Sequence, residues 1–138
     1  MQRKALRSEP NLVTVSEIHA CLPWAASSVP RARHLLAEFK DRLETQVHQD
    51  AQLLVTEAMS NAFRHGAPKA ALRLTIKLIH NGLYVQVVNR RATAFPTMPE
   101  APPPSGGGLG LRLLDTLADE WETGYTDDIV VVWFTMRG

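Results

Sequence analysis

The hydrophobic residues recur with two different spacings, and these spacings predict the helices and strands of the chain. Apolar residues three and four positions apart run through residues 30–46 and again through residues 50–64, which is typical of amphipathic helices. Strict alternation of apolar and polar residues over 71–79 predicts a strand with one buried face. An Asn-Gly pair then indicates a hairpin into a second strand at 83–89.

The rest of the pattern completes a predicted order of β-α-α-β-β-loop-α-β. Residues 11–20 mix β-branched and polar residues and predict a first strand. Helical periodicity resumes over 109–121, residues 123–128 form a predicted turn, and 129–136 is a nearly continuous apolar strand suited to the interior of a sheet. This order favours an α+β fold, a two-layer sandwich of a mixed β-sheet with helices on one face.

Residues 90–107 have no periodicity and contain five of the nine prolines of the chain. An irregular segment of this length inside a compact domain is usually functional, often a lid, although a disordered and tolerated insertion has the same composition. We expect residues 1–10 to form a flexible tail. Residues 11–138 then form one domain, a size that can bury a core without disulfides or a structural metal.

The composition excludes several classes of function. The 138 residues carry a net charge of +1, which gives no electrostatic reason to expect nucleic acid or an anionic membrane as partner. No apolar run approaches the ~20 residues of a membrane span, and no signal peptide is predicted. A single cysteine, Cys21, excludes an internal disulfide and favours a reducing, cytoplasmic setting. Cys21 fits either a nucleophile or a small buried apolar residue.

Glu57 and Asn61 are the first candidate functional residues. They lie one turn apart on the predicted helix 50–64, on the face opposite its apolar stripe. An amide oxygen is a suitable ligand for Mg²⁺, and a carboxylate one turn earlier could serve as a general base. A solvated helix face has the same pattern, so the spacing alone leaves both interpretations open.

The second candidate feature is "SGGGLGL", at residues 105–111, where four glycines crowd the start of a predicted helix. Glycine permits close approach of the backbone to a ligand, and a helix start offers free N–H groups and the positive end of the helix dipole. These are the properties of a phosphate site. The segment matches neither the dinucleotide fingerprint nor a P-loop, and a glycine-rich hinge without ligand is the alternative.

Together the two features carry a resemblance to a known family. "LLVTEAMSNAFRHG" resembles the N box of the histidine-kinase-type ATPase fold, also called the Bergerat or GHKL fold, and "GGGLGLRLLDTLADEW" resembles its second glycine box. The nearest likeness is to the small stand-alone bacterial members, the anti-sigma-factor serine/threonine kinases and their actinobacterial relatives. The resemblance covers about residues 22–136.

The resemblance implies ATP and Mg²⁺ as cofactors and assigns roles to individual residues. Asn61 would bind Mg²⁺, and Glu57 would polarise the attacking hydroxyl or water. ATP would lie between the sheet and a lid formed by the loop before the glycine box. The implied nucleotide-binding residues are Asn61, His65, Gly66, Asn89, Gly106, Gly108, Leu109 and Gly110.

The chain departs from the family pattern on the adenine side of this site. Asn89 stands where the family has an Asp that accepts a hydrogen bond from the adenine amino group, and Arg91 replaces a Gly two residues later. Asn retains an acceptor oxygen but lacks the charge, which predicts adenine binding weaker by about 1 kcal/mol. The last strand also lacks the Thr often found near its start.

Two functions follow as expectations. The resemblance implies an anti-sigma-factor type regulator that binds a sigma factor and uses Mg-ATP to phosphorylate Ser or Thr of an anti-sigma-factor antagonist, and a homodimer is expected because relatives are often dimers. The alternative is a non-catalytic protein-binding module, with a degenerate nucleotide pocket, that sequesters a regulatory partner. Asn89 favours the alternative, whereas Glu57 and Asn61 favour the kinase.

Overall fold

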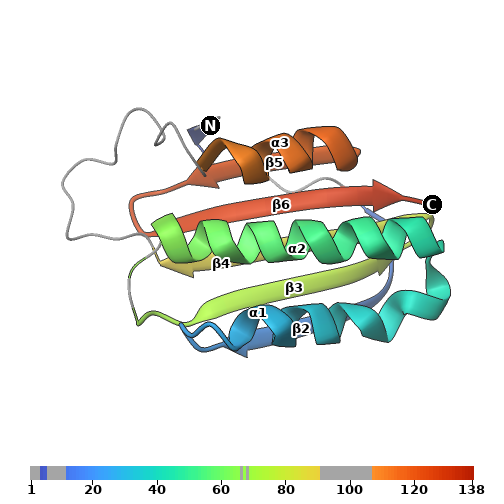
Figure 1. Cartoon of the computed structure of the whole chain (residues 1–138), viewed down its shortest axis with the longest axis horizontal. Coiled ribbons are helices and arrows are strands. Elements are labelled where there is room, and N and C mark those ends of the chain that lie inside the picture. The colour runs from blue at the N-terminus through green and yellow to red at the C-terminus, as the bar shows by residue number, and fades with distance from the viewer. Residues whose placement is uncertain (1–3, 6–11, 66, 68, 91–106) are drawn as a thin grey trace.

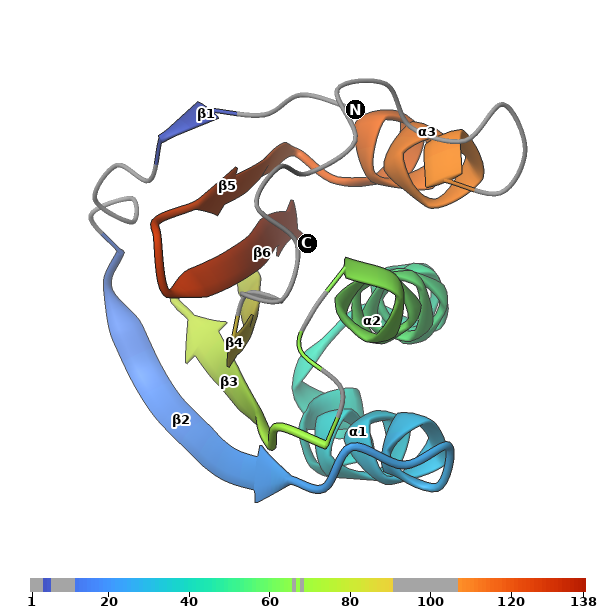
Figure 2. The same cartoon turned by 90° about the vertical axis from the view of Figure 1, so that its left-hand side faces the viewer.

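The structure, a computed structural model, describes residues 4–5, 12–65, 67, 69–90 and 107–138. Helices cover one face of a six-stranded sheet, as Figure 2 shows, which confirms the predicted α+β sandwich. The elements are β1 (Lys4–Ala5), β2 (Thr14–Leu22), α1 (Ser28–Leu36), the 3₁₀ helix η1 (Ala37–Arg42), α2 (Thr45–His65), β3 (Leu72–Ile79), β4 (Gly82–Arg90), α3 (Gly107–Leu117), β5 (Glu120–Tyr125) and β6 (Ile129–Arg137).

The strand order is β1-β5-β6-β4-β3-β2, and the sheet is mixed. β1 pairs parallel to β5, whereas the pairs from β5 to β2 are antiparallel. β6 therefore lies inside the sheet, as its continuous apolar sequence predicts.

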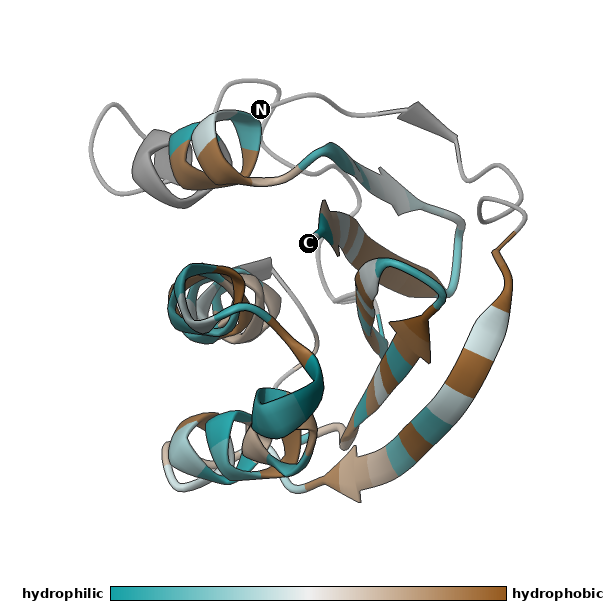
Figure 3. Cartoon of the chain, turned by 90° about the vertical axis from the view of Figure 1, so that its right-hand side faces the viewer, coloured by the Kyte–Doolittle hydropathy of each residue, from teal (hydrophilic) through white to brown (hydrophobic). Residues whose placement is uncertain are grey.

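The core lies between the sheet and α2. The predicted apolar stripe of this helix is buried in this core, and so is the predicted apolar face of β3. Figure 3 shows the alternation of hydrophobic and hydrophilic residues along the strands as bands of brown and teal. Burial of apolar surface at these positions contributes hydrophobic stabilisation of about 25 cal/mol for each Å² removed from water. The buried residues of these two faces are Leu54, Val55, Ala58, Met59, Ala62, Leu72, Leu74, Ile76 and Leu78.

The helix predicted over 30–46 is interrupted. α1 ends at Leu36, η1 follows, and Leu43 has extended backbone angles before α2 begins. The apolar spacing runs on through this break, because Leu36 and Phe39 are both buried. A spacing of three residues fits an α-helix and a 3₁₀ helix alike, so the pattern alone did not show where one ends.

β5 was not predicted, and the sequence interpretation of residues 120–128 is wrong in part. Trp121 was placed at the end of the third helix, and residues 123–128 were placed in a turn. The helix ends at Leu117, and Trp121 lies on β5 and packs against the core from there. The four-residue step from Leu117 to Trp121 imitates a helical period, whereas the pairing of β5 with β6 is non-local and leaves no local signal.

Gly82 has a different role from the one its sequence suggests. The turn between β3 and β4 is His80-Asn81, and Gly82 is the first residue of β4. A Cβ atom at this position would overlap the carbonyl oxygen of Met136 and lie 2.8 Å from Cα of Arg137, both on β6. Glycine is required here by the close approach of the neighbouring strand.

The two regions predicted to be mobile fall largely outside the described residues. Of the predicted tail over 1–10, only Lys4–Ala5 are described, and they form β1 at the edge of the sheet. Of the predicted lid over 90–107, residues 91–106 lie outside the described part of the chain. Within the described residues, no helix is long and apolar enough to cross a membrane.

Candidate functional site

The candidate site is built on the C-terminal half of α2, which lies between α1 and α3 (Figures 1 and 2). Hydrogen bonds anchor this helix to α1. Arg33 Nη1 on α1 donates to Oγ1 of Thr56 on α2 at 3.1 Å, and Gln52 Nε2 donates to the carbonyl oxygen of Arg33 at 3.0 Å. The helix that carries Glu57 and Asn61 is therefore held in place immediately before these residues.

Asn61 is a buried amide without a partner. Its side chain is 5% exposed, and neither Oδ1 nor Nδ2 has a hydrogen-bond partner among the described residues. Leaving a buried polar group unpaired costs about 1–3 kcal/mol, so such a group needs an explanation, and a water, an ion or a ligand that satisfies it is one. The sequence placed Asn61 on the polar face of the helix, but it is not a solvated surface residue.

Glu57 lies one helical turn before Asn61 on α2. Its side chain is half-buried and forms no hydrogen bond or ion pair with any described residue. A half-buried carboxylate that is not neutralised by a cation is available to accept a proton. The structure thus places the two residues of the predicted N box one helical turn apart on α2, and neither side chain is paired with another described residue.

Asn89, near the end of β4, reaches the same part of α2. Its side chain is 3% exposed, and Nδ2 donates to the carbonyl oxygen of Ala62 at 3.0 Å. Its Oδ1 is buried and has no partner among the described residues. Asn89 is therefore held against the residue that follows Asn61, and it presents a second unsatisfied oxygen at this end of the molecule.

A main-chain bond also connects these two elements. The N–H of Ala67, two residues beyond the end of α2, donates to the carbonyl oxygen of Arg90 at 2.7 Å. With the bond from Asn89 to Ala62, this contact joins the C-terminal end of α2 to the C-terminal end of β4. These two bonds hold Asn89 beside the turn of α2 that follows Asn61, although the two residues are far apart in sequence.

The start of α3 lies at the same end of the molecule as the ends of α2 and β4 (Figure 1). The first turn of α3 contains three of the predicted phosphate-site residues, Gly108, Leu109 and Gly110. Its N–H groups carry the positive end of a helix dipole, whereas the end of α2 carries the negative end of another. His65 is the last residue of α2; Gly66, Gly106 and the side chain of His65 lie outside what the structure describes.

This arrangement fits magnesium and a nucleotide in the chemistry of its donors. Mg²⁺ takes oxygen ligands and is usually bound by one or two protein groups together with substrate phosphates. Oδ1 of Asn61 is such a group, and it lies near the negative end of α2. Among the described residues no group of three His, Cys, Asp or Glu side chains gathers as a metal site.

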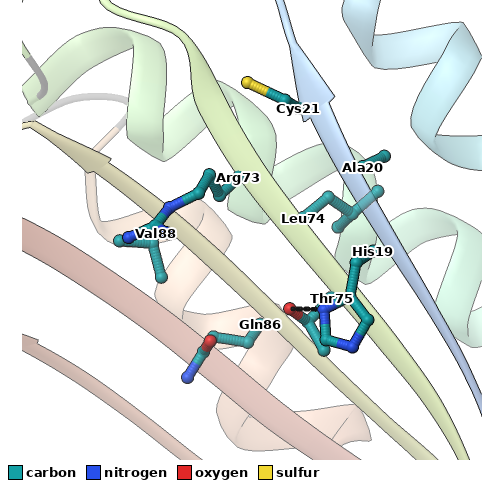
Figure 4. Close-up of a pocket in the computed structure, with 8 residues that line it drawn as sticks. All are labelled: His19, Ala20, Cys21, Arg73, Leu74, Thr75, Gln86 and Val88. Carbon is teal, nitrogen blue, oxygen red and sulfur yellow. Dashed lines mark hydrogen bonds between the residues drawn. The ribbon is translucent and has the colours of Figure 1, made fainter.

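A hollow of about 410 Å³ lies elsewhere, on the face of the sheet away from the helices (Figure 4). It contains none of the predicted site residues. One hydrogen bond, between Thr75 Oγ1 and His19 Nδ1 at 3.3 Å, crosses part of it. Its lining residues range from exposed, as at His19, Cys21 and Arg73, to buried, as at Leu74. Its lining residues are His19, Ala20, Cys21, Arg73, Leu74, Thr75, Gln86 and Val88.

Comparison with known proteins gives the family. A model of the histidine kinase-like ATPase domain matches residues 22–136, nearly the whole described chain. The chain belongs to the histidine kinase-like ATPase family. The family match spans both predicted sequence motifs, so the resemblance of fold and family drawn from the sequence is confirmed.

A solved structure agrees with this family at the level of the fold. The chain is similar to the RsbU and RsbW domains of Rv1364c from Mycobacterium tuberculosis, with a TM-score of 0.68 and 16% identity. The match covers 89% of this chain and 32% of that chain, so the histidine kinase-like ATPase domain described here spans about a third of its length. No curated protein matched the chain significantly.

The part of Ala62 in this site was not predicted. Its contribution is a main-chain carbonyl, which no side-chain pattern reveals. The position of Ala62 near the end of the predicted helix was the available signal.

Proposed function

We propose that the chain binds Mg-ATP between the end of α2, the end of β4 and the start of α3. The observation that carries this proposal is the set of buried side-chain atoms without a partner among the described residues, namely Oδ1 and Nδ2 of Asn61 and Oδ1 of Asn89. The bond from Nδ2 of Asn89 to the carbonyl oxygen of Ala62 holds Asn89 against the residue that follows Asn61. Membership of an ATPase family supplies the ligand class. Asn61 Oδ1 would bind Mg²⁺, which neutralises charge that develops on the phosphates when it is bound.

We further propose that the bound ATP serves as phosphate donor for a Ser or Thr of an anti-sigma-factor antagonist, and that a sigma factor is the regulated partner. The resemblance to the anti-sigma-factor kinases supports this. Glu57 supports it as well, because its free carboxylate could take the proton of an attacking hydroxyl. The hydroxyl oxygen bonds to the γ-phosphorus, the bond to the β–γ bridging oxygen breaks, and ADP leaves.

The alternative is a module that binds its partner without catalysis. Asn89 in place of the family's Asp is the observation that favours it. The two functions differ in one measurable way. A kinase transfers label from γ-labelled ATP to a co-encoded small antagonist protein, whereas the module binds its partner and leaves the antagonist unlabelled.

Asn61→Ala tests the proposed nucleotide site. The wild-type protein should be stabilised by Mg-ATP, by about 2.7 kcal/mol at a ligand concentration of 100 times Kd. The variant should lose affinity for Mg-ATP by at least about 10–100-fold, since even partners outside the ligand sphere of a metal contribute that much. Thermal melting with and without Mg-ATP measures both effects.

The same variant should not be destabilised in the absence of nucleotide. Asn61→Ala removes an amide that is unsatisfied in the described chain, so the melting temperature of the free protein should stay equal or rise. Ser60→Ala, at the neighbouring half-buried position of α2, is the matched control and should keep the Mg-ATP shift. If Asn61→Ala kept the full shift as well, the proposed site would be wrong.

A further inference from the structure

β2 has a free main-chain edge. It is the last strand on its side of the sheet, and no described strand pairs with its outer side (Figure 2). Proteins usually protect such an edge with a short strand, a Lys or Pro, a bulge, or a covering element. β2 is nine residues long, contains no Lys, Arg or Pro, and has its irregular register at its start, between Thr14 and Ser16. The part from Glu17 to Leu22 is therefore open to pairing with another extended chain.

The hollow on the face of the sheet away from the helices adjoins this edge (Figure 4). Arg73 of β3 lines it and stands directly opposite Cys21 of β2. Arg73 is exposed and forms no hydrogen bond or ion pair with any described residue. Neighbouring strands lie about 4.8 Å apart, so a strand added to β2 would run about 10 Å from β3. Because Cys21 is small, a long side chain paired with it from outside can reach past it to Arg73.

The charges on these three strands favour an acidic side chain at this place. Glu17 is the single acidic residue in the sequences of β2, β3 and β4, whereas β3 and β4 carry Arg73, Lys77 and Arg90. The carboxylate of Glu17 is already engaged, because its Oε1 lies 2.7 Å from Nε2 of His19. A carboxylate brought beside Arg73 would form a charge-assisted hydrogen bond that no described residue supplies.

We propose that β2 binds an extended acidic segment of another protein, which adds a strand to the sheet and places a carboxylate beside Arg73. Main-chain hydrogen bonds to β2 supply affinity, and Arg73 selects the acidic residue. A second copy of this chain fits less well, because its β2 offers only Glu17, which is bonded to His19. A nucleic acid has no ladder of N–H and C=O groups to match an edge strand. The inference uses no nucleotide and goes beyond the proposed function.

A capped heptapeptide of alternating Thr and Val with a central Glu is the probe for this site. NMR titration of the isotopically labelled full chain should shift the signals of β2 and of Arg73. With the peptide at saturation, main-chain N–H groups at alternate residues of β2 should exchange with solvent at least about tenfold more slowly, because alternate groups face an added strand. A purely electrostatic contact would not give this protection. The same peptide with a central Gln should bind about tenfold more weakly.

Variants of the exposed Arg73 test the selection of the acidic residue. Arg73→Gln should abolish the tenfold preference for the Glu peptide over the Gln peptide, and Arg73→Lys should keep most of it. Arg42→Gln, at an exposed basic position of η1, is the matched control and should keep the preference in full. An unchanged preference in Arg73→Gln would overturn the role of Arg73.

Three further results would overturn the inference as a whole. The first is no binding of the Glu peptide to wild type at about 1 mM peptide. The second is a dimer in sedimentation whose β2 N–H groups are protected without peptide, which would make a second copy the occupant. The third is a single-stranded oligonucleotide that displaces the peptide and shifts the Arg73 signals. None of these measurements contains Mg-ATP, so the proposed nucleotide site stands or falls separately.

Discussion

Glu57→Gln is expected to lower phosphate transfer to an antagonist by about 10²–10⁴-fold, the range that general base catalysis contributes. The amide has nearly the same shape as the carboxylate but cannot take the proton of the attacking hydroxyl. Because Glu57 forms no hydrogen bond or ion pair with the described residues, the stability of the protein should change little. Transfer of label from γ-labelled ATP to a co-encoded antagonist measures the effect.

Measuring the affinity of Glu57→Gln for Mg-ATP distinguishes a loss of catalysis from a loss of nucleotide binding. Asn61, not Glu57, is the proposed magnesium ligand, so Glu57→Gln should bind Mg-ATP within about threefold of wild type, a difference of less than 1 kcal/mol. Glu38→Gln, at an exposed acidic position of η1, is the matched control and should transfer label normally. If Glu57→Gln transferred label as fast as wild type, Glu57 would not be the general base.

Gly82→Val is expected to destabilise the protein by about 3 kcal/mol or more. Overpacking a core costs about 1–3 kcal/mol when side chains can move, but here the obstacle is the main chain of β6 at Met136 and Arg137. Both strands lie inside the sheet, so neither can move away without disturbing its other neighbour. The loss is a large part of a typical stability of 5–15 kcal/mol and should lower the melting temperature by about 10 °C.

His80→Ala is the control for this prediction. His80 lies in the same turn with its side chain exposed, and its main-chain N–H still donates to Val13 O after truncation. The variant should stay within about 0.5 kcal/mol of wild type in chemical denaturation. If Gly82→Val proved equally mild, the close approach of β6 would not be the reason for glycine at this position.

The elements with a repeated local pattern were predictable, and those that depend on distant partners were not. β3, β4 and β6 show their alternation or their continuous apolar run, and the core stripe of α2 follows from its period. β5 was missed because its strand character comes from pairing with β6. A pattern reports which side of an element is buried, whereas pairing between strands is decided elsewhere in the chain.

In the candidate site, too, the features with a local sequence pattern were predictable and those that depend on distant partners were not. The spacing of Glu57 and Asn61 placed them on one face of a helix, which is what the structure has. The apolar period also put Asn61 on the polar face of the helix, because the period does not show which other elements cover that face. The structure buries the amide. The bond from Asn89 to Ala62 joins a side chain to a main-chain atom, and no sequence pattern contains it.

Replacing Mg²⁺ by Mn²⁺ in the nucleotide complex most directly tests the proposal that Asn61 binds the metal of Mg-ATP. Mn²⁺ takes the oxygen ligands that suit Mg²⁺, and its unpaired electrons broaden NMR signals of nearby nuclei. A titration with Mn-ATP should broaden the amide signals around Asn61 in α2 first, and those of Asn89 with them. Signals of Cys21 and Arg73, on the helix-free face, should remain sharp. If broadening began at Cys21 and Arg73, or if the signals around Asn61 did not broaden, the proposed Mg-ATP site at Asn61 would be wrong.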